Sequence, residues 1–231
     1  MDRYRFVFID LDDTIWDFHT NARISLELMF NDRGLARYFS DFDEFFRIYA
    51  KRNIELWEAY GKGEITQDFL KAERFRYPLA KMGVDDAELA EAIGHQYLDI
   101  LPTQKVLMPG ALEILDFLVK KYPLTIISNG FKETQHRKID SSGIRHYFAH
   151  IVLSEEAGAL KPDPKIFEYA MQLNKARPEE CIMIGDSYTA DIQGAINAGI
   201  DQVYYPLEGK IKPNQPATFT INQLSELRTF L

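Results

Sequence analysis

Three aspartates stand directly after a short apolar run near the start of the chain, and they are the residues best suited to chemistry. The run is Phe6-Val7-Phe8-Ile9, and Asp10-Leu11-Asp12-Asp13-Thr14 follows it. Such a run is typical of a strand buried on both faces of a parallel sheet, and open α/β sheets bind ligands at the carboxyl ends of their strands. Carboxylates crowded there repel one another unless a cation holds them, and such hard oxygen ligands suit Mg²⁺. An isolated pattern of this kind would also fit a solvated acidic turn.

Three further groups of polar residues each follow an apolar run, and together they favour a ligand site over a solvated turn. Ser128-Asn129-Gly130 follows the run 124–127, and Lys161 in the stretch 158–164 comes after the run 151–153. Asp186 follows the run 181–184 and Gly185, and Asp191 lies a little further on. Because the carboxyl ends of parallel strands meet at one edge of a sheet, we expect all four groups to lie together. They would supply a nucleophilic carboxylate, a hydroxyl, a lysine and a second acidic pair.

This ordered set resembles the four-motif signature of the haloacid dehalogenase-like (HAD) superfamily. The signature is D-x-D-x-T, then Ser or Thr, then Lys, then G-D-S-x-x-x-D, and the stretch 161–167 sharpens the match. The resemblance covers the whole chain. Within the superfamily, the stretch from Asp10 to Phe18, with Asn21 behind it, is similar to the bacterial 5′-nucleotidases that act on pyrimidine nucleotides.

The resemblance implies a role for each motif residue. Asp10 would be the nucleophile that forms an aspartyl-phosphate, and Asp12 would be the general acid and base for both steps. Mg²⁺ would be held by Asp10, Asp186 and the backbone carbonyl of Asp12, with Asp191 in the layer behind these ligands. The phosphate oxygens would be bound by the remaining motif residues, which are Ser128, Asn129, Gly130 and Lys161.

The elements that must position these residues alternate in a regular way after Pro109-Gly110. Strands are expected at 124–128, 151–154, 181–185 and 202–205, with helices at about 110–121, 133–142, after Pro164 and at 189–198, then a strand at 218–220 and a final short helix. This alternation indicates an α/β fold with a parallel sheet. Between Asp10 and Leu124 the chain reads as helices, which is far more than one crossover needs.

We therefore expect a doubly wound, Rossmann-like parallel sheet core with an inserted all-helical cap domain. The core would comprise residues 1–17 and 104–231, and the cap residues 18–103. The helix from about Gln67 would be capped by Thr66, and the apolar stretch 42–60 would be one long helix or an interrupted one. A loop is expected at 213–216. Most aromatic residues of the cap read as helix–helix packing, but Trp16 and Phe18 follow the catalytic loop directly, so we predict that they contact the substrate together with Asn21.

The composition of the chain limits the classes of partner that we expect it to bind. The 231 residues carry a formal net charge of −8, which argues against nucleic acid polymers because phosphate backbones require basic patches. No apolar run approaches the ~20 residues of a membrane span. Cys181 is the only cysteine and reads as a packed thiol. We expect a cytoplasmic protein, a monomer or weak homodimer, whose partner is a small phosphate ester.

Several activities remain open at this point. We expect a Mg²⁺-dependent phosphatase, with pyrimidine nucleoside monophosphates as its substrates. A haloacid dehalogenase would use the same nucleophile on carbon but would need neither metal nor a proton donor at position 12, so Asp12 and Asp186 argue against it. A sugar-phosphate phosphatase or phosphomutase would share the core motifs. A binding protein without catalysis would be expected to lose the nucleophile or a metal ligand, and this chain has both.

Overall fold

The computed structural model describes residues 3–207 and 216–231. They form two compact units, a core unit (Met1–Phe18 and Lys105–Leu231) and a helical unit (His19–Gln104). The loop predicted at 213–216 lies outside the described residues except for Pro216. None of the helices in the described ranges is long and apolar enough to span a membrane.

The core unit is built on a six-stranded sheet in which every neighbouring pair is parallel. The strand order is β3-β2-β1-β4-β5-β6, so the chain starts in the middle and winds outward in both directions. The strands are β1 (Phe6–Ile9), β2 (Leu124–Ser128), β3 (Phe148–Leu153), β4 (Cys181–Gly185), β5 (Asp201–Tyr204) and β6 (Phe219–Thr220). This topology confirms the predicted doubly wound α/β fold.

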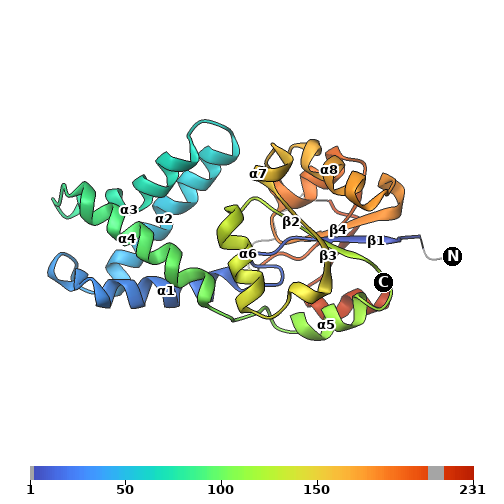
Figure 1. Cartoon of the computed structure of the whole chain (residues 1–231), viewed down its shortest axis with the longest axis horizontal. Helices are drawn as coiled ribbons and strands as arrows, with labels where there is room; N and C mark the ends of the chain where they lie inside the picture. The colour runs from blue at the N-terminus through green and yellow to red at the C-terminus, as the bar shows by residue number, and fades with distance from the viewer. Residues whose placement is uncertain (1–2, 208–215) are drawn as a thin grey trace. The chain divides into compact units, whose positions relative to one another are not determined.

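Helices cover both faces of the sheet, as Figure 1 shows for α5 on one face and α8 on the other. The helices of this unit are α5 (Ala111–Leu118), α6 (Lys132–Ser141), α7 (Ser154–Ala157), α8 (Pro164–Asn174) and α9 (Gln193–Asn197), and the short 3-10 helices span Arg145–Tyr147, Pro178–Glu180 and Leu224–Thr229. One hydrophobic cluster joins Phe8, Ile127 and Met183 of the sheet to Phe167 of α8. Strands buried on both faces in this way require the near-continuous apolar sequences that predicted them.

The helical unit is an insertion after the loop that follows β1, as the sequence indicated. Its helices are α1 (Phe18–Asp32), α2 (Phe42–Gly61), α3 (Gln67–Lys81) and α4 (Ala87–Ile100), with 3-10 helices at Leu35–Arg37 and Leu101–Thr103. Thr66 caps α3 as predicted, because its hydroxyl accepts a hydrogen bond from the N–H of Phe69. The stretch 42–60 proves to be a single helix with no interruption. Tyr49 of α2 stacks on Phe75 of α3 at 5.2 Å between ring centroids, which places these aromatic residues in the packing of the unit.

Two elements of the core unit differ from their prediction. Strand β3 begins at Phe148, earlier than expected, because its first half is partly exposed and lacks the apolar run that identifies the second half. The helix predicted at 189–198 begins as a π-helix (Tyr188–Ile192) and continues as α9. A π-helical turn widens the backbone and shifts the side chains that follow, and this turn carries Asp191.

Candidate active site

Asp10 lies just beyond the carboxyl end of β1, in the centre of the sheet. Its backbone N–H donates to the carbonyl of Ile184 on β4 at 2.9 Å, which extends the pairing of the two strands. Its side chain is 9% exposed and forms an ion pair with Lys161. The carboxylate that the sequence assigns as nucleophile is therefore buried and paired with a lysine.

Lys161 joins three of the four motifs through its ammonium group. Besides Asp10, Nζ donates to the backbone oxygen of Ile127 on β2 at 2.7 Å and to Oδ1 of Asp191 at 2.6 Å. Its side chain is 3% exposed. A buried ammonium group is costly unless its hydrogens find acceptors, and here all three have one.

Asp191 of the last motif is held at the start of the π-helix. Oδ1 of Asp191 bonds to Lys161, and Oδ2 accepts the N–H of Ser187 at 3.0 Å, so both oxygens are engaged. Asp191 is fully buried and occupies the space beside Gly185, where an added Cβ would collide with its carboxyl group. Carboxylate oxygens of Asp10, Asp186 and Asp191 lie within 4.8 Å of one another.

Burial and crowding shift the proton affinities of these groups. Burial, together with the nearby Asp191 and Asp12, raises the pKa of Asp10 to about 8, although Lys161 opposes the rise. Burial also raises the pKa of Asp186 well above its ordinary value, and Asp191 and Asp10 add to that effect. For Lys161, burial acts to lower the pKa, but the two carboxylates beside it raise the pKa above its usual range.

These charges fit a divalent cation. Three carboxylates lie together beside one lysine ammonium group, so the cluster carries more negative than positive charge when all three are ionised. A set of oxygen donors with excess negative charge suits a hard cation such as Mg²⁺. The donor chemistry of the residues present is therefore compatible with the metal that the sequence predicted.

The loop after β2 is bonded to the loop that carries Lys161. The side-chain amide of Asn129 donates to the backbone oxygen of Lys161 at 2.9 Å and accepts its N–H at 2.7 Å. Ser128, which ends β2, accepts hydrogen bonds on Oγ from the N–H of Gly130 at 3.2 Å and from Nε2 of Gln135 at 2.7 Å. Two accepted bonds occupy the lone pairs of a hydroxyl and leave its proton to be donated.

Asp12 lies apart from the acidic cluster and is held by two residues that the sequence did not predict. Gln135 Nε2 donates to Oδ2 at 2.8 Å, and Lys138 Nζ donates to Oδ1 at 2.7 Å. Both donors lie on α6, three residues apart, and so share one helix face. The positions of Gln135 and Lys138 shortly after Ser128 were the only indication of this role in the sequence. A lysine in a helix is ordinarily interpreted as a solvated charge.

The three predicted substrate residues are placed differently from one another. Trp16 has no exposed surface, and its indole N–H donates to the hydroxyl of Ser142 at 3.1 Å. Phe18 begins α1 and lies 6.5 Å from Trp16 between ring centroids. Asn21 is also fully buried. The ring of Trp16 packs within the core unit, and the contact of Trp16 with a substrate stays a prediction.

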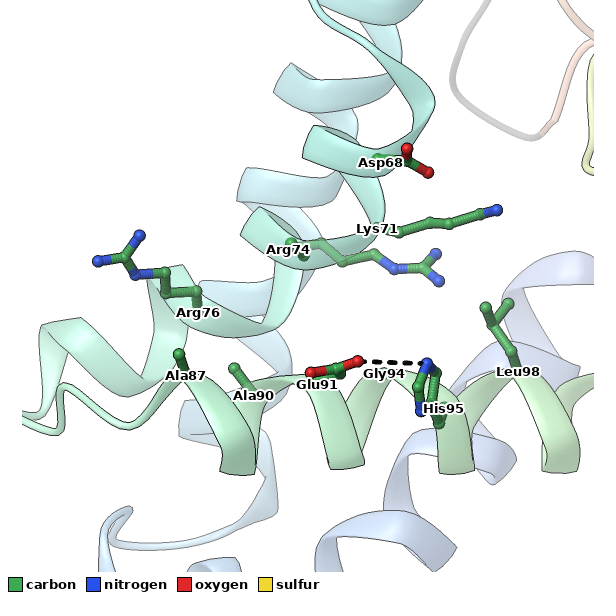
Figure 2. A pocket seen from close by; sticks show the side chains of 11 residues that line it. Asp68, Lys71, Arg74, Arg76, Ala87, Ala90, Glu91, Gly94, His95 and Leu98 are labelled. Carbon is green, nitrogen blue, oxygen red and sulfur yellow. Dashed lines mark ion pairs between the residues drawn. The ribbon is translucent and has the colours of Figure 1, made fainter.

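A separate cavity of about 410 Å³ lies wholly within the helical unit, between α3 and α4 (Figure 2). Arg74 is almost completely buried in its wall, and its guanidinium carbon lies about 5 Å from the ring centroids of Phe75 and Tyr97. His95 and Glu91 form a long ion pair of 3.9 Å at its edge. The lining carries both signs of charge and none of the residues predicted as sites.

Comparisons with known proteins agree with this geometry. The chain is 31% identical over 231 residues to the pyrimidine 5′-nucleotidase YjjG of Escherichia coli, covering 99% of this chain and 98% of the relative. It is 31% identical to the pyrimidine 5′-nucleotidase PynA of Streptococcus pneumoniae, covering 87% and 84% of the two chains. A crystal structure of YfnB from Bacillus subtilis, bound to magnesium, superposes with a TM-score of 0.89 at 30% identity and covers 99% and 98%. Residues 4–199 match the model of the haloacid dehalogenase-like hydrolases, and the chain belongs to that family.

Proposed function

We propose that this hydrolase is a Mg²⁺-dependent phosphatase that acts on small phosphate monoesters, with pyrimidine nucleoside monophosphates as preferred substrates. The observation that carries the proposal is the buried carboxylate of Asp10 beside Lys161, with Asp186 and Asp191 within reach and a second, separately held carboxylate at Asp12. A phosphate ester needs a nucleophile, charge neutralisation and a proton source, and this arrangement offers all three.

The first step transfers the phosphoryl group to the enzyme. A carboxylate oxygen of Asp10 attacks phosphorus, and an O–P bond forms while the bond to the leaving oxygen breaks. Asp12, in its protonated form, gives its proton to the leaving oxygen, since an alkoxide is a poor leaving group. The product of this step is an aspartyl-phosphate and a free alcohol.

The second step returns the enzyme to its starting state. Asp12, now ionised, takes a proton from water as the water oxygen attacks phosphorus. The acyl-phosphate bond breaks, inorganic phosphate leaves and Asp10 is again a carboxylate. One residue can act as acid and then as base because the first step leaves it in the form that the second step needs.

Mg²⁺ would be held by the carboxylates of Asp10 and Asp186 and by the backbone oxygen of Asp12. When bound, it supplies positive charge that allows an anionic phosphate to approach an anionic nucleophile. Asp191 would serve behind these ligands, because its two oxygens are already bonded to Lys161 and to the N–H of Ser187. The magnesium-bound structure of YfnB supports the choice of metal.

Ser128 and Lys161 would bind the non-bridging oxygens of the phosphate, with Asn129 and Gly130 beside them. The hydroxyl of Ser128 has its lone pairs occupied and its proton available, which suits a donor to a phosphate oxygen. Lys161 would exchange one of its present bonds for the phosphate. Its charge would then stabilise the negative charge that develops on the transferred group.

The preference for pyrimidine nucleotides rests on the two full-length nucleotidase relatives, YjjG and PynA. The core contacts are common to every phosphate ester, so discrimination must come from groups on the leaving side. Trp16, Phe18 and Asn21 are the proposed contacts on that side, and Trp16 and Asn21 have no exposed surface in this structure.

The proposal is tested by comparing kcat/KM for dUMP, UMP and TMP with kcat/KM for AMP and for a hexose phosphate, with and without Mg²⁺. We expect the pyrimidine nucleotides to be hydrolysed best and only with the metal. A clear preference for the hexose phosphate would remove the nucleotidase assignment and leave the phosphatase. Halide release from a 2-haloacid in EDTA, without phosphatase activity, would instead establish a dehalogenase.

A further inference from the structure

Lys138 is a buried charge that the proposed reaction does not use. Its side chain is 3% exposed, and its ammonium group lies 2.7 Å from Oδ1 of Asp12, whose side chain is 27% exposed. A lysine is almost never buried this fully without a partner, because its charge must leave water. The surroundings of Lys138 therefore favour one arrangement of its side chain, in which the ammonium group pairs with the carboxylate of Asp12.

Two aromatic rings lie close to the same ammonium group. Nζ lies 4.5 Å from the ring centroid of Trp16 and 5.2 Å from that of Phe18, both within the range of a cation–π contact. The indole is itself fixed to α6 through its bond to Ser142. The lysine thus joins helix α6 to the loop that follows β1, and it does so at the residue proposed to carry the proton.

Gln135 holds the second oxygen of the same carboxylate. It is fully buried, and Nε2 donates to Oδ2 of Asp12 at 2.8 Å and to Oγ of Ser128 at 2.7 Å, which uses both of its hydrogens. The amide fits because position 130 is glycine, where an added Cβ would collide with it. Gln135 therefore connects the proposed proton carrier to the proposed phosphate-binding hydroxyl.

We propose that Lys138 and Gln135 are positioning residues that fix the carboxyl group of Asp12 for proton transfer to the leaving oxygen, an inference that rests on the proposed phosphatase function. One donor on each oxygen sets both the location and the plane of the group. Each carboxyl oxygen keeps a second lone-pair position, which can carry the proton that is given to the leaving oxygen or accept a hydrogen bond from the attacking water. Correct orientation of a reacting group is worth large factors in rate.

The experiment compares two leaving groups in a Lys138→Met variant, which preserves volume and removes the donor. The quantity is kcat/KM, because it reports steps up to the departure of the leaving group. A nucleoside monophosphate needs the proton, and p-nitrophenyl phosphate does not. We expect kcat/KM to fall by about 10- to 100-fold for the nucleotide and by less than about 3-fold for the aryl ester. Equal losses on the two esters would overturn the proposal, since a general structural defect predicts them.

A double-mutant cycle with Asp12→Asn tests whether Lys138 acts through Asp12. In the Asp12→Asn background, Lys138→Met should change kcat/KM for the nucleotide by less than about 2-fold, because the group to be positioned is already lost. Additive losses would contradict the proposal. Lys132→Met is the matched control, because Lys132 lies on the same helix, is half exposed and pairs with Glu156 at 2.8 Å. It should leave both activities unchanged.

A second variant keeps the test decisive if Lys138→Met does not fold. Gln135→Met removes the other donor at similar volume, and it should lower the ratio of nucleotide to aryl-ester kcat/KM. Any loss of phosphate binding through Ser128 affects both esters and cancels in that ratio. An unchanged ratio in an active variant refutes the positioning role and leaves the phosphatase intact. A wild-type protein inactive on every ester removes the proposed function and this inference together.

Discussion

Oδ1 of Asp191 lies 2.6 Å from Nζ of Lys161, and both side chains are almost completely excluded from solvent. Lys161 comes from the loop before α8 and Asp191 from the π-helix after β4, so the pair connects the third motif to the fourth. A buried ion pair contributes little net stability by itself, but removing one partner leaves the other charge without compensation. The pair is therefore required for the geometry of the site and contributes little to the net stability of the fold.

The first prediction follows from the cost of removing one partner of a buried ion pair. Lys161→Met should destabilise the metal-free protein by about 3–5 kcal/mol, because Asp10 and Asp191 would remain buried without their cation. The free energy of unfolding in urea measures this loss. Lys165→Met, on the exposed start of α8, serves as the control and should change it by less than about 0.5 kcal/mol. Equal stability of Lys161→Met and wild type would show that the ion pair is not maintained in solution.

Asp10→Asn should abolish phosphatase turnover while the protein stays folded. An amide cannot form the acyl-phosphate, and one fewer negative charge relieves repulsion in the cluster. Phosphate release and circular dichroism, measured on the same preparation, check the two halves of the prediction. Turnover close to that of wild type would remove Asp10 as the nucleophile.

Metal removal should stop the reaction, and Asp186→Asn should weaken metal binding and rate together. The pKa of Asp186 is raised well above its usual range, by burial first and by Asp191 and Asp10 next, so a cation beside it would stabilise its ionised form. Titration of EDTA-treated protein with Mg²⁺ gives the affinity, and phosphate release gives the rate. Full activity of the wild type in EDTA would contradict the metal-dependent mechanism.

Magnesium affinity should rise with pH up to about pH 8. Burial raises the pKa of Asp10 to about 8 in the metal-free protein, so below that pH the metal must displace a proton. Release of one proton per metal corresponds to about a tenfold gain in affinity per pH unit. Calorimetric titration in buffers of different ionisation enthalpy counts the proton directly. Affinity that does not change between pH 6 and 8 would show that Asp10 is already ionised.

The same shift predicts how the stability of the metal-free protein depends on pH. A carboxyl group whose pKa is higher in the folded state binds a proton there that the unfolded chain has lost, so stability falls as pH rises towards about 8. Tm without metal should decrease across this range and should recover when Mg²⁺ is added. Asp10→Asn should reduce the slope, and an unaltered slope would assign the effect to other groups.

The sequence predicted the sheet and the order of the motifs well because both depend on local patterns. Strands buried on both faces need continuous apolar runs, and the polar residues that follow these runs necessarily meet at one edge. The partly exposed start of β3 lacks such a run and was placed too late. The π-helix that carries Asp191 has no signature distinct from an ordinary helix, so its altered direction could not be read from the chain.

The residues around Asp12 were beyond sequence reasoning for a different reason. Lys138 looks like a solvated lysine until the fold brings Trp16 and Phe18 against it, and only then does its burial become visible. Trp16 shows the converse. Its place beside the loop that follows β1 predicts contact with a ligand, and the fold adds two contacts that the sequence does not indicate. Its ring lies against Lys138, and its indole N–H donates to Ser142.

Gly130 and Gly185 shape part of the site because they have no side chain. Each leaves vacant the volume that its own side chain would fill, and a residue further along the chain, Gln135 or Asp191, occupies it. Substitution at either position can only add atoms, so neither glycine has a conservative replacement. The mutational sensitivity of this site therefore extends to two positions that carry no reactive group, and a search for chemically active side chains would pass over both.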